Sequence, residues 1–449
     1  MSAPPAPPAP PTPSAPPEPP ALPAPPALPG ASVSGRILRI GTARALNTLG
    51  RQLLSVAVGW ELYDRTGSAF TLGMVGLVQV IPVVALFVPA GYLVDHRDRR
   101  ALTALAALIT GVAGAGLALA SWQAASVLSY YALLLVLGCA TALHSPASSS
   151  YIASIIPRHE LARAAAVVSG MYELAAILGP AVAGLLLAVV APSWVYGLAG
   201  ATGLASAALY RSLPRPAPRA PQASEPQANE PQASARRDWR AGLRFIFSSP
   251  LLLPALTLDL FAVLFAGATA LLPVIAKDVL HVGPEGLGVL RAAPSVGAIA
   301  MALLATRLPP WRRPGRVLLI VVALFGLATI GFGLSRSFAL SLALLAACGV
   351  LDNISVVIRI TLEQLVVPDQ IRGRVSAVHS VFIGMSNELG ELESGVAATL
   401  LGAVPAIVLG GGVAVVVVGV VALLWPALAR MPPLAELTPE TRTAGPTAP

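Results

Sequence analysis

The sequence predicts an all-α polytopic membrane protein with 12 transmembrane helices, arranged as two pseudo-symmetric bundles of six. Composition, the number of long apolar segments and an internal repeat support this prediction. Only 11% of the 449 residues are Asp, Glu, Lys or Arg, against roughly 25% in an ordinary soluble domain. Hydrophobic residues make up 55%, and the mean hydropathy is +0.75. A soluble fold could not cover so much apolar surface, so the solvent must be a lipid bilayer.

Twelve segments are long enough to cross a bilayer, because a spanning helix needs about 20 mainly apolar residues. They lie at about 45–63, 69–93, 101–120, 126–148, 161–188, 192–210, 250–275, 285–306, 316–335, 338–360, 373–402 and 403–427. The expected divisions are a Pro-rich tail at 1–35, a first bundle at 36–212, a linker at 213–238, a second bundle at 239–430 and a C-terminal tail at 431–449. We expect a short amphipathic helix, "RRDWRAGLRFIF", on the inner surface after the linker.

The basic residues predict the orientation of the chain. With the N-terminus in the cytoplasm, only Arg65, Lys277, Arg291 and Arg336 of the 29 Lys and Arg fall at or near the outer side. Cytoplasmic loops of membrane proteins are enriched in Lys and Arg, so we expect both termini and the linker to be cytoplasmic. This use of basic residues also removes the need to invoke nucleic acid as a partner. The first thirty residues lack the basic and apolar regions of a signal peptide, and they predict a disordered tail.

An internal repeat relates the two halves of the chain. Residues 138–184 align without a gap with residues 349–395. The identities that carry most weight are the pairs Pro157/Pro368, Arg163/Arg374, Gly179/Gly390 and Gly184/Gly395. Two parallel six-helix halves joined by a cytoplasmic linker are the repeat pattern of the major facilitator superfamily.

The charged turn "GYLVDHRDRR", residues 91–100, resembles the signature loop of that superfamily between helices 2 and 3. The positions that match it are Gly91, Leu93, Asp95, Arg99 and Arg100, whereas His96 and Asp98 depart from the general form. The resemblance implies a conformational latch that forms in one access state and breaks in the other. We expect Gly91 to let helices 2 and 11 approach closely, and Asp95 to face the positive end of helix 11. The alternative is a solvated basic turn that only sets topology.

Helix 5 carries a second resemblance, in "GMYELAAILGPAVAG". Its residues Gly170, Gly179, Pro180 and Gly184 are similar to the glycine–proline motif of drug/proton antiporters in the superfamily, which favours export over import. Further stretches, above all "VPDQIRGRVSAVHSVFIGMSNELGELESG", look like the enterobactin-exporter branch, in which Asp98 is ordinary. This likeness implies efflux of a siderophore or drug-like molecule across a bacterial inner membrane, by a monomer without cofactor or metal.

Ionisable residues inside spanning helices are costly and therefore usually face a cavity or a partner. On helix 11, Glu388 and Glu391 are three residues apart and share one face, so they raise each other's proton affinity and could couple transport to a proton gradient. Asp259 on helix 7 is the next candidate for proton coupling, and His379 is another because histidine titrates near neutral pH. The alternatives are an outer aqueous mouth for the glutamates and a hydrogen-bonded structural histidine.

Other polar residues are candidates for the lining of a central cavity. They are Asn47, Arg51, Gln79, Glu173 and Asp352, of which Arg51 could attract an anionic substrate. Arg359 and Glu363, four residues apart on helix 10, predict a salt bridge at the inner end. Helix 4 lacks the intramembrane arginine of many drug/proton antiporters, so their proton cycle does not transfer directly.

The competing function classes are an enzyme and a different kind of transporter. The sequence holds no His-Glu-x-x-His, no Gly-x-Ser-x-Gly and no Walker-type loop, which argues against an embedded enzyme and against ATP-driven transport. An importer or a lysophospholipid flippase with the same fold remains open as the alternative to an exporter.

Overall fold

The computed structural model describes residues 32–215, 239–266, 268–309 and 311–436. Most of the expected N-terminal tail and linker, and the end of the C-terminal tail, lie outside these residues. Within them the chain forms helices and no strands. The first bundle consists of α1 (Val33–Thr66), α2 (Ala69–His96), α3 (Arg99–Trp122), α4 (Val127–Ile155), α5 (Leu161–Val189) and α6 (Pro192–Ser212), with the short turn η1 (Arg158–Glu160) before α5.

The second bundle begins with the short helix α8 (Trp239–Ser248), at the place where the sequence predicts an amphipathic helix. Its long helices are α9 (Leu252–Ala266), α11 (Pro284–Ala305), α12 (Pro314–Leu334), α13 (Phe338–Val366), α14 (Asp369–Leu401) and α15 (Ala403–Leu424). Three short pieces, η2 (Ala268–Leu271), α10 (Leu272–Val274) and the π-helical η3 (Ile275–Val279), continue α9. The chain then ends in α16 (Pro426–Ala429) and η4 (Leu434–Glu436).

Nine helices of the described chain are long and apolar enough to cross a membrane. They are α2, α3, α4, α5, α9 with its continuation, α11, α12, α13 and α15. Three further helices, α1, α6 and α14, have 34, 21 and 33 residues but do not belong to this group. Both α1 and α14 carry charged residues, some of which line a cavity between the two bundles. The fold class is thus confirmed, whereas the number of 12 spans stays a prediction.

Local sequence explains how neighbouring helices are joined. Gly67 ends α1 with a φ of 59°, a left-handed conformation that glycine adopts without steric cost. Ser68 then caps α2, because its side chain accepts a hydrogen bond from the backbone N–H of Thr71. Asp98 caps α3 in the same way, accepting from the N–H groups of Arg100 and Ala101. These caps satisfy backbone donors that have no partner inside a helix.

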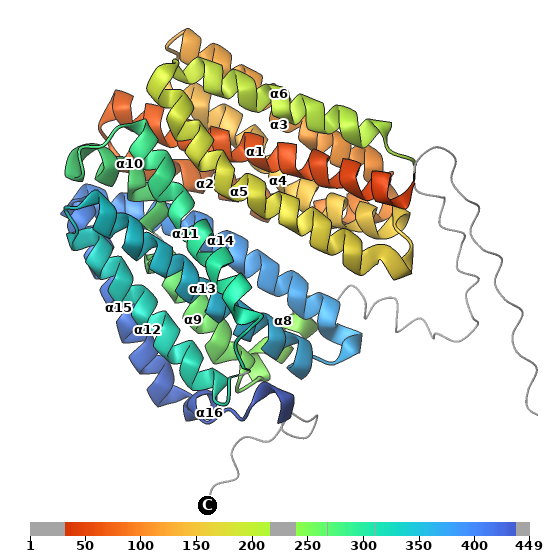
Figure 1. The fold of residues 1–449 in the computed structure, drawn as a ribbon, viewed down its shortest axis with the longest axis vertical. Coiled ribbons are helices and arrows are strands. Elements are labelled where there is room, and N and C mark those ends of the chain that lie inside the picture. The colour runs from red at the N-terminus through yellow and green to blue at the C-terminus, as the bar shows by residue number, and fades with distance from the viewer. Residues whose placement is uncertain (1–31, 216–238, 267, 310, 437–449) are drawn as a thin grey trace, which may run out of the picture.

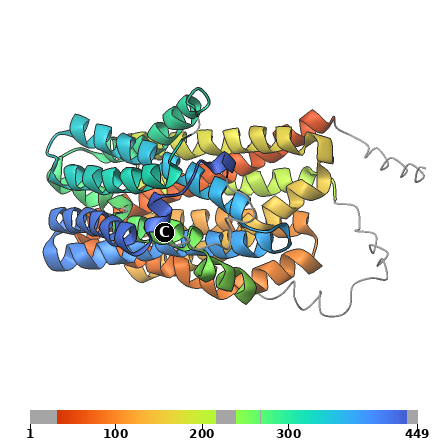
Figure 2. The ribbon, with the colours of Figure 1, turned by 90° about the horizontal axis from the view of Figure 1, so that it is seen from below.

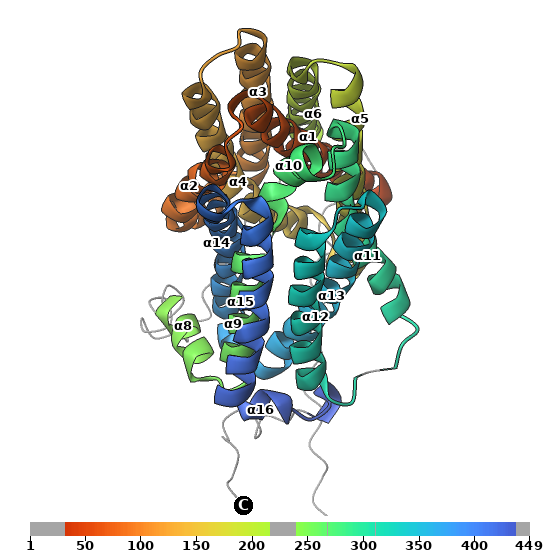
Figure 3. The ribbon, with the colours of Figure 1, turned by 90° about the vertical axis from the view of Figure 1, so that its left-hand side faces the viewer.

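The two bundles contact each other at one end and diverge toward the other (Figure 1). We call the end where α1 begins and α6 ends the linker side, and the opposite end the far side. The helices of both bundles run lengthwise between these ends (Figure 2). The segment η2–α10–η3 lies at the junction of the bundles, where it contacts α1, α2, α11 and α14 (Figure 3).

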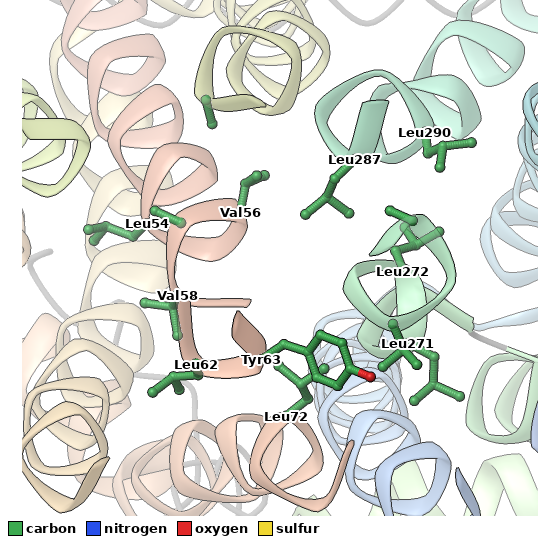
Figure 4. Packing of buried hydrophobic residues seen from close by; sticks show 14 of the residues in the cluster. Leu54, Val56, Val58, Leu62, Tyr63, Leu72, Leu271, Leu272, Leu287 and Leu290 are labelled. Carbon is green, nitrogen blue, oxygen red and sulfur yellow. The ribbon is translucent and has the colours of Figure 1, made fainter. Parts of the chain in front are cut away.

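The apolar core follows the same division. On the far side one cluster runs across both bundles and joins Leu62 and Leu72 to Leu272 and Leu287 (Figure 4). Toward the linker side each bundle has a core of its own, around Tyr151 in the first and around Ile358 and Leu362 in the second. Within the described residues, shared apolar burial therefore holds the bundles together at the far side.

Candidate functional site

A cavity of about 320 Å³ lies between the two bundles. Its lining comes from α1, α2, α4 and α5 of the first bundle and from η2, α10, α11 and α14 of the second. The ionisable residues of the lining are Arg44, Arg51, His144, Tyr172, Arg291, Glu388 and Glu391. The uncharged polar residues are Asn47, Thr48, Gln52, Ser55, Gln79, Ser145 and Ser148. A chamber with this mixed polar and apolar lining can bind a solute that carries polar and ionised groups.

Helix α1 supplies the largest part of this lining. Arg51, Ser55 and Gly59 follow one another at four-residue spacing, so they share one face of the helix. Near the linker side, the Arg44 guanidinium lies 5.4 Å from the centre of the Tyr172 ring, which forms a cation–π contact between α1 and α5. Arg51 forms no ion pair in the described part of the chain, so its charge faces the cavity without a fixed partner.

The five residues expected to line a cavity fall in three places. Asn47, Arg51 and Gln79 belong to the central lining. Glu173 lies exposed on α5, outside that lining. Asp352 lines a second and much smaller hollow inside the second bundle, together with Asp259.

Glu388 and Glu391 lie at the cavity, as neighbours on one face of α14. Glu391 sits against α2, where a methyl group on Gly76 would come within 2.7 Å of its Cβ atom. Gly76 therefore makes room for this side chain at the contact between the bundles. Neither carboxylate forms an ion pair within the described residues, although Arg51 and Arg291 line the same cavity.

Arg291 of α11 is a cavity residue that sequence reasoning assigned only to the outer side of the membrane. Its Nη2 atom donates a hydrogen bond of 2.7 Å to Ser55 Oγ of α1, so the contact joins the two bundles. Sequence alone could have signalled Arg291 as the basic residue inside the apolar window 285–306.

Pairs of small residues allow the bundles to approach closely on the far side. A methyl group on Gly73 of α2 would lie 3.0 Å from the Cα atom of Gly395 on α14. A methyl group on Gly184 of α5 would lie 2.7 Å from the Cα atom of Gly288 on α11. Gly179 meets α1 in a similar way, at the Gln52 side chain. Pro180 is buried within α5, next to this contact.

Two motif glycines nearer the linker side have no such contacts. Nothing lies within 4 Å of a methyl group built on Gly91 or Gly170. The expectation that Gly91 brings helices 2 and 11, which are α2 and α14, close together is therefore wrong for this conformation.

The charged turn after α2 is held to its own bundle. Arg100 donates hydrogen bonds to the backbone carbonyls of Leu213, at 2.8 Å, and Arg211, at 3.2 Å, at the end of α6. Arg99 donates to the Val94 carbonyl at 3.5 Å. The side chain of Asp95 lies outside the described residues, so its predicted approach to α14 stays a prediction.

The buried charges of the second bundle are paired across helices. Arg359 of α13 forms an ion pair with Asp259 of α9, and its Nη1 atom donates to Ser355 Oγ at 3.1 Å. Glu363 of α13 accepts a hydrogen bond from Ser376 and lies 2.6 Å from His379 Nδ1, both on α14.

The expected Arg359–Glu363 bridge is therefore wrong. Each residue has a partner on a neighbouring helix, and such a partner compensates the charge and also satisfies a polar group between two packed surfaces. Asp259 and His379, expected as coupling residues, lie in these two pairs.

Polar contacts also join the bundles at the far side. Lys277 Nζ of η3 lies 2.6 Å from Asp64 Oδ1 at the end of α1, and Tyr63 donates a hydrogen bond to Asp278. Lys277 also lies 6.0 Å from the centre of the Tyr63 ring. Together with the shared apolar core, these contacts close the far end of the cavity.

The chain has relatives among characterised proteins and solved structures. It is 30% identical over 368 residues to the enterobactin exporter EntS of Shigella flexneri, covering 81% of this chain and 84% of that protein. The enterobactin exporter EntS of Citrobacter koseri is 29% identical over 367 residues, with the same coverage.

Among solved structures, a bacterial homologue of the human lysosomal transporter Spinster, in an inward-facing and unoccupied conformation, superposes with a TM-score of 0.66. It is 17% identical and covers 89% of this chain and 98% of its own. The nucleoside transporter NupG gives a TM-score of 0.64 at 13% identity, over 87% of this chain and 100% of its own.

A sequence profile of the Major Facilitator Superfamily matches residues 40–391. That match spans most of both bundles and the cavity between them, and the structural neighbours share the two-bundle fold. The chain therefore belongs to the Major Facilitator Superfamily and is a multi-pass membrane transporter rather than an enzyme.

Proposed function

We propose that this protein is a secondary active exporter of a bacterial inner membrane, which moves a small amphiphilic molecule, a siderophore or a drug-like compound, by alternating access. The observation that carries the proposal is the cavity between the bundles, with Arg51, Glu388 and Glu391 unpaired within the described residues. Rocking of the bundles around such a site exposes it to one side at a time. The exporter names of the relatives and the Gly170–Gly184 motif on α5 support export.

We place both termini and the linker in the cytoplasm, on the strength of the basic residues. The described conformation is then the inward-facing one, because the far side is closed by the core around Leu62 and Leu287. Gly91 of the latch has open space around it in this state. In the outward-facing state we expect Gly91, Asp95, Arg99 and Arg100 to contact α14.

We assign proton coupling to Glu388 and Glu391. The two carboxylates face the chamber in which the substrate would bind, so that a proton and the substrate can compete for the same charges. Arg51 in the same chamber would attract an acidic group of the substrate.

The proposal is tested by transport in everted membrane vesicles with a pH-sensitive dye, while siderophores and cationic drugs are added in turn. The wild type is compared with Glu388→Gln/Glu391→Gln, and with Glu393→Gln as a matched control on the same helix but outside the cavity lining. We expect one class of compound to discharge the gradient in the wild type and in the control, and the double variant to lose at least about 90% of that response.

Two other outcomes have clear meanings. If labelled substrate leaves the cytoplasm without proton movement, proton antiport is wrong and another ion or no ion drives export. If uptake into the cytoplasm is the favoured direction, or if only lysophospholipid changes leaflet, the importer or the flippase replaces the exporter.

A further inference from the structure

Arg291 joins the two bundles at a polar contact next to a close approach of α11 and α5. It lies three residues after Gly288, so both residues occupy the same face of α11. Gly288 packs against Gly184 of α5, and Arg291 donates to Ser55 of α1. The hydrogen bond of 2.7 Å therefore forms where α11 faces the first bundle, in the state that is closed on the far side.

Ser55 presents its hydroxyl from the cavity face of α1. It follows Arg51 by one turn and precedes Gly59, and all three residues line the cavity. A methyl group on Gly59 would lie 3.3 Å from Pro273 of α10, so this face of α1 also packs on the second bundle. Loss of the Arg291–Ser55 bond would remove a polar tie from the interface that must open for the far side to be exposed.

The second possible partner of Arg291 is the pair of carboxylates on α14. Glu391 and Glu388 line the same cavity as Arg291 and are the acidic side chains of that lining. Both belong to the second bundle, as Arg291 does. In the described residues no ion pair within 4 Å joins them to Arg291, which instead bonds to a neutral hydroxyl of the other bundle.

We infer that Arg291 transmits the protonation state of Glu388 and Glu391 to the interface between the bundles. When the carboxylates carry protons, Arg291 binds Ser55 and the far side stays closed. When they ionise, Arg291 moves to them, releases Ser55 and weakens the closure of the far side. This inference rests on the proposed proton coupling and makes Arg291 a positioning residue for the transport cycle.

The other charged and titratable groups of the cavity are Arg44, Arg51, His144 and Tyr172. Arg44 is engaged with the Tyr172 ring, and the His144 ring packs edge-on against Tyr210 at 6.0 Å. Arg51 lies on α1 and could also pair with an ionised Glu388. An Arg51–Glu388 pair would join the two bundles and favour closure of the far side. Movement of Arg291 to the glutamates would have the opposite effect on this closure.

The direction agrees with antiport. A proton released toward the linker side leaves ionised carboxylates, frees Ser55 and weakens the closure of the far side, through which the bound substrate then leaves. A proton taken up at the far side neutralises the carboxylates and restores the Arg291–Ser55 bond, which returns the transporter to the described state.

The test measures the distance between the bundles as the pH changes. In a background of Cys139→Ser and Cys348→Ala, spin labels are placed at His159→Cys and Arg312→Cys, two exposed positions in linker-side turns of the first and second bundle. Double electron–electron resonance measures the distances between the two labels in nanodiscs, between about pH 5 and about pH 9. The populations of long and short distances give the ratio of linker-open to linker-closed molecules.

In the otherwise unchanged protein we expect the linker-open population to fall as the pH rises. Ser55→Ala removes the acceptor, so it should lower the open-to-closed ratio about tenfold at acidic pH and leave the alkaline ratio nearly unchanged. Ser55→Thr keeps the hydroxyl and should restore the wild-type profile. Arg291→Gln should lower the open-to-closed ratio at acidic pH in the same way as Ser55→Ala.

Two results separate this inference from the proton-coupling proposal. If Ser55→Ala and Arg291→Gln both keep the wild-type profile while Glu388→Gln/Glu391→Gln loses its pH response, the role of Arg291 is overturned and proton coupling stands. If the glutamate variant also titrates like the wild type, both ideas fail together. An equal loss of the linker-open state at every pH would show Ser55 to be a purely structural contact, which also overturns the inference.

Discussion

The buried charges of the second bundle and those of the central cavity lie in opposite electrostatic situations. In the bundle core, Asp259 has Arg359 and Glu363 has His379 as a fixed partner. In the cavity, Glu388 and Glu391 have no ion pair in the described residues. A charge without a partner in a membrane helix must be compensated by water, a proton or a ligand. Paired charges therefore stabilise one arrangement of helices, whereas unpaired ones can still take up a proton or bind a ligand.

The largest expected effect comes from breaking a pair in the bundle core. Arg359→Leu leaves the Asp259 carboxylate, only 6% exposed, without its counter-charge. We expect the free energy of unfolding to fall by about 3–5 kcal/mol, seen as a large drop in the apparent Tm of the purified protein in detergent. Asp259→Leu/Arg359→Leu removes both charges and should recover most of this loss, because it leaves no isolated charge.

Transport by that double variant decides the role of Asp259. Recovery of both Tm and transport would make the pair structural and remove Asp259 from the coupling candidates. Recovery of Tm without transport would place Asp259 in the proton path beside the cavity glutamates, and the contrast between the two regions would no longer hold.

An intermediate effect is expected at Arg51, and it should concern binding rather than stability. Arg51→Gln removes a charge that has no ion pair in the described chain, so the apparent Tm should change little. The affinity for a transported acid should fall about tenfold or more, since a hydrogen bond to a charged group contributes about 1.5–3 kcal/mol. Isothermal titration of the purified protein measures this loss, with Arg51→Lys as the charge-conserving control. A lower Tm with unchanged affinity would show that Arg51 stabilises the fold and does not bind the substrate.

The smallest effect is expected for the exposed pair at the far side. The side chains of Lys277 and Asp64 are 39% and 55% exposed, so solvent screens their attraction. Lys277→Met should cost about 0.2–1 kcal/mol at low salt, and less at high salt. A double-mutant cycle with Asp64→Asn, followed by apparent Tm at both salt concentrations, measures the coupling. A coupling energy as large as that of the Asp259–Arg359 pair would show that exposure does not distinguish these charges.

Several features of the site could be predicted from local sequence. The spacing of Glu388 and Glu391 fixes them on one face of a helix wherever that helix lies, and the polar residues Asn47, Arg51 and Gln79 stand out in apolar windows. Gly184 was assigned only to the helix 5 motif, and its packing against Gly288 could not be predicted. Gly91 was assigned a contact that this conformation does not make.

Composition, the apolar segments and the internal repeat by themselves determined the membrane class, the two related halves and the presence of charges that need compensation. These properties do not depend on which helices pack together. The tertiary structure decided which partner each charge finds. Arg359 binds Asp259 rather than Glu363, and Arg291 binds Ser55, because α9 and α1 lie opposite them in this packing. It also decided which glycines touch, since two rigid bundles that meet at one end must separate at the other.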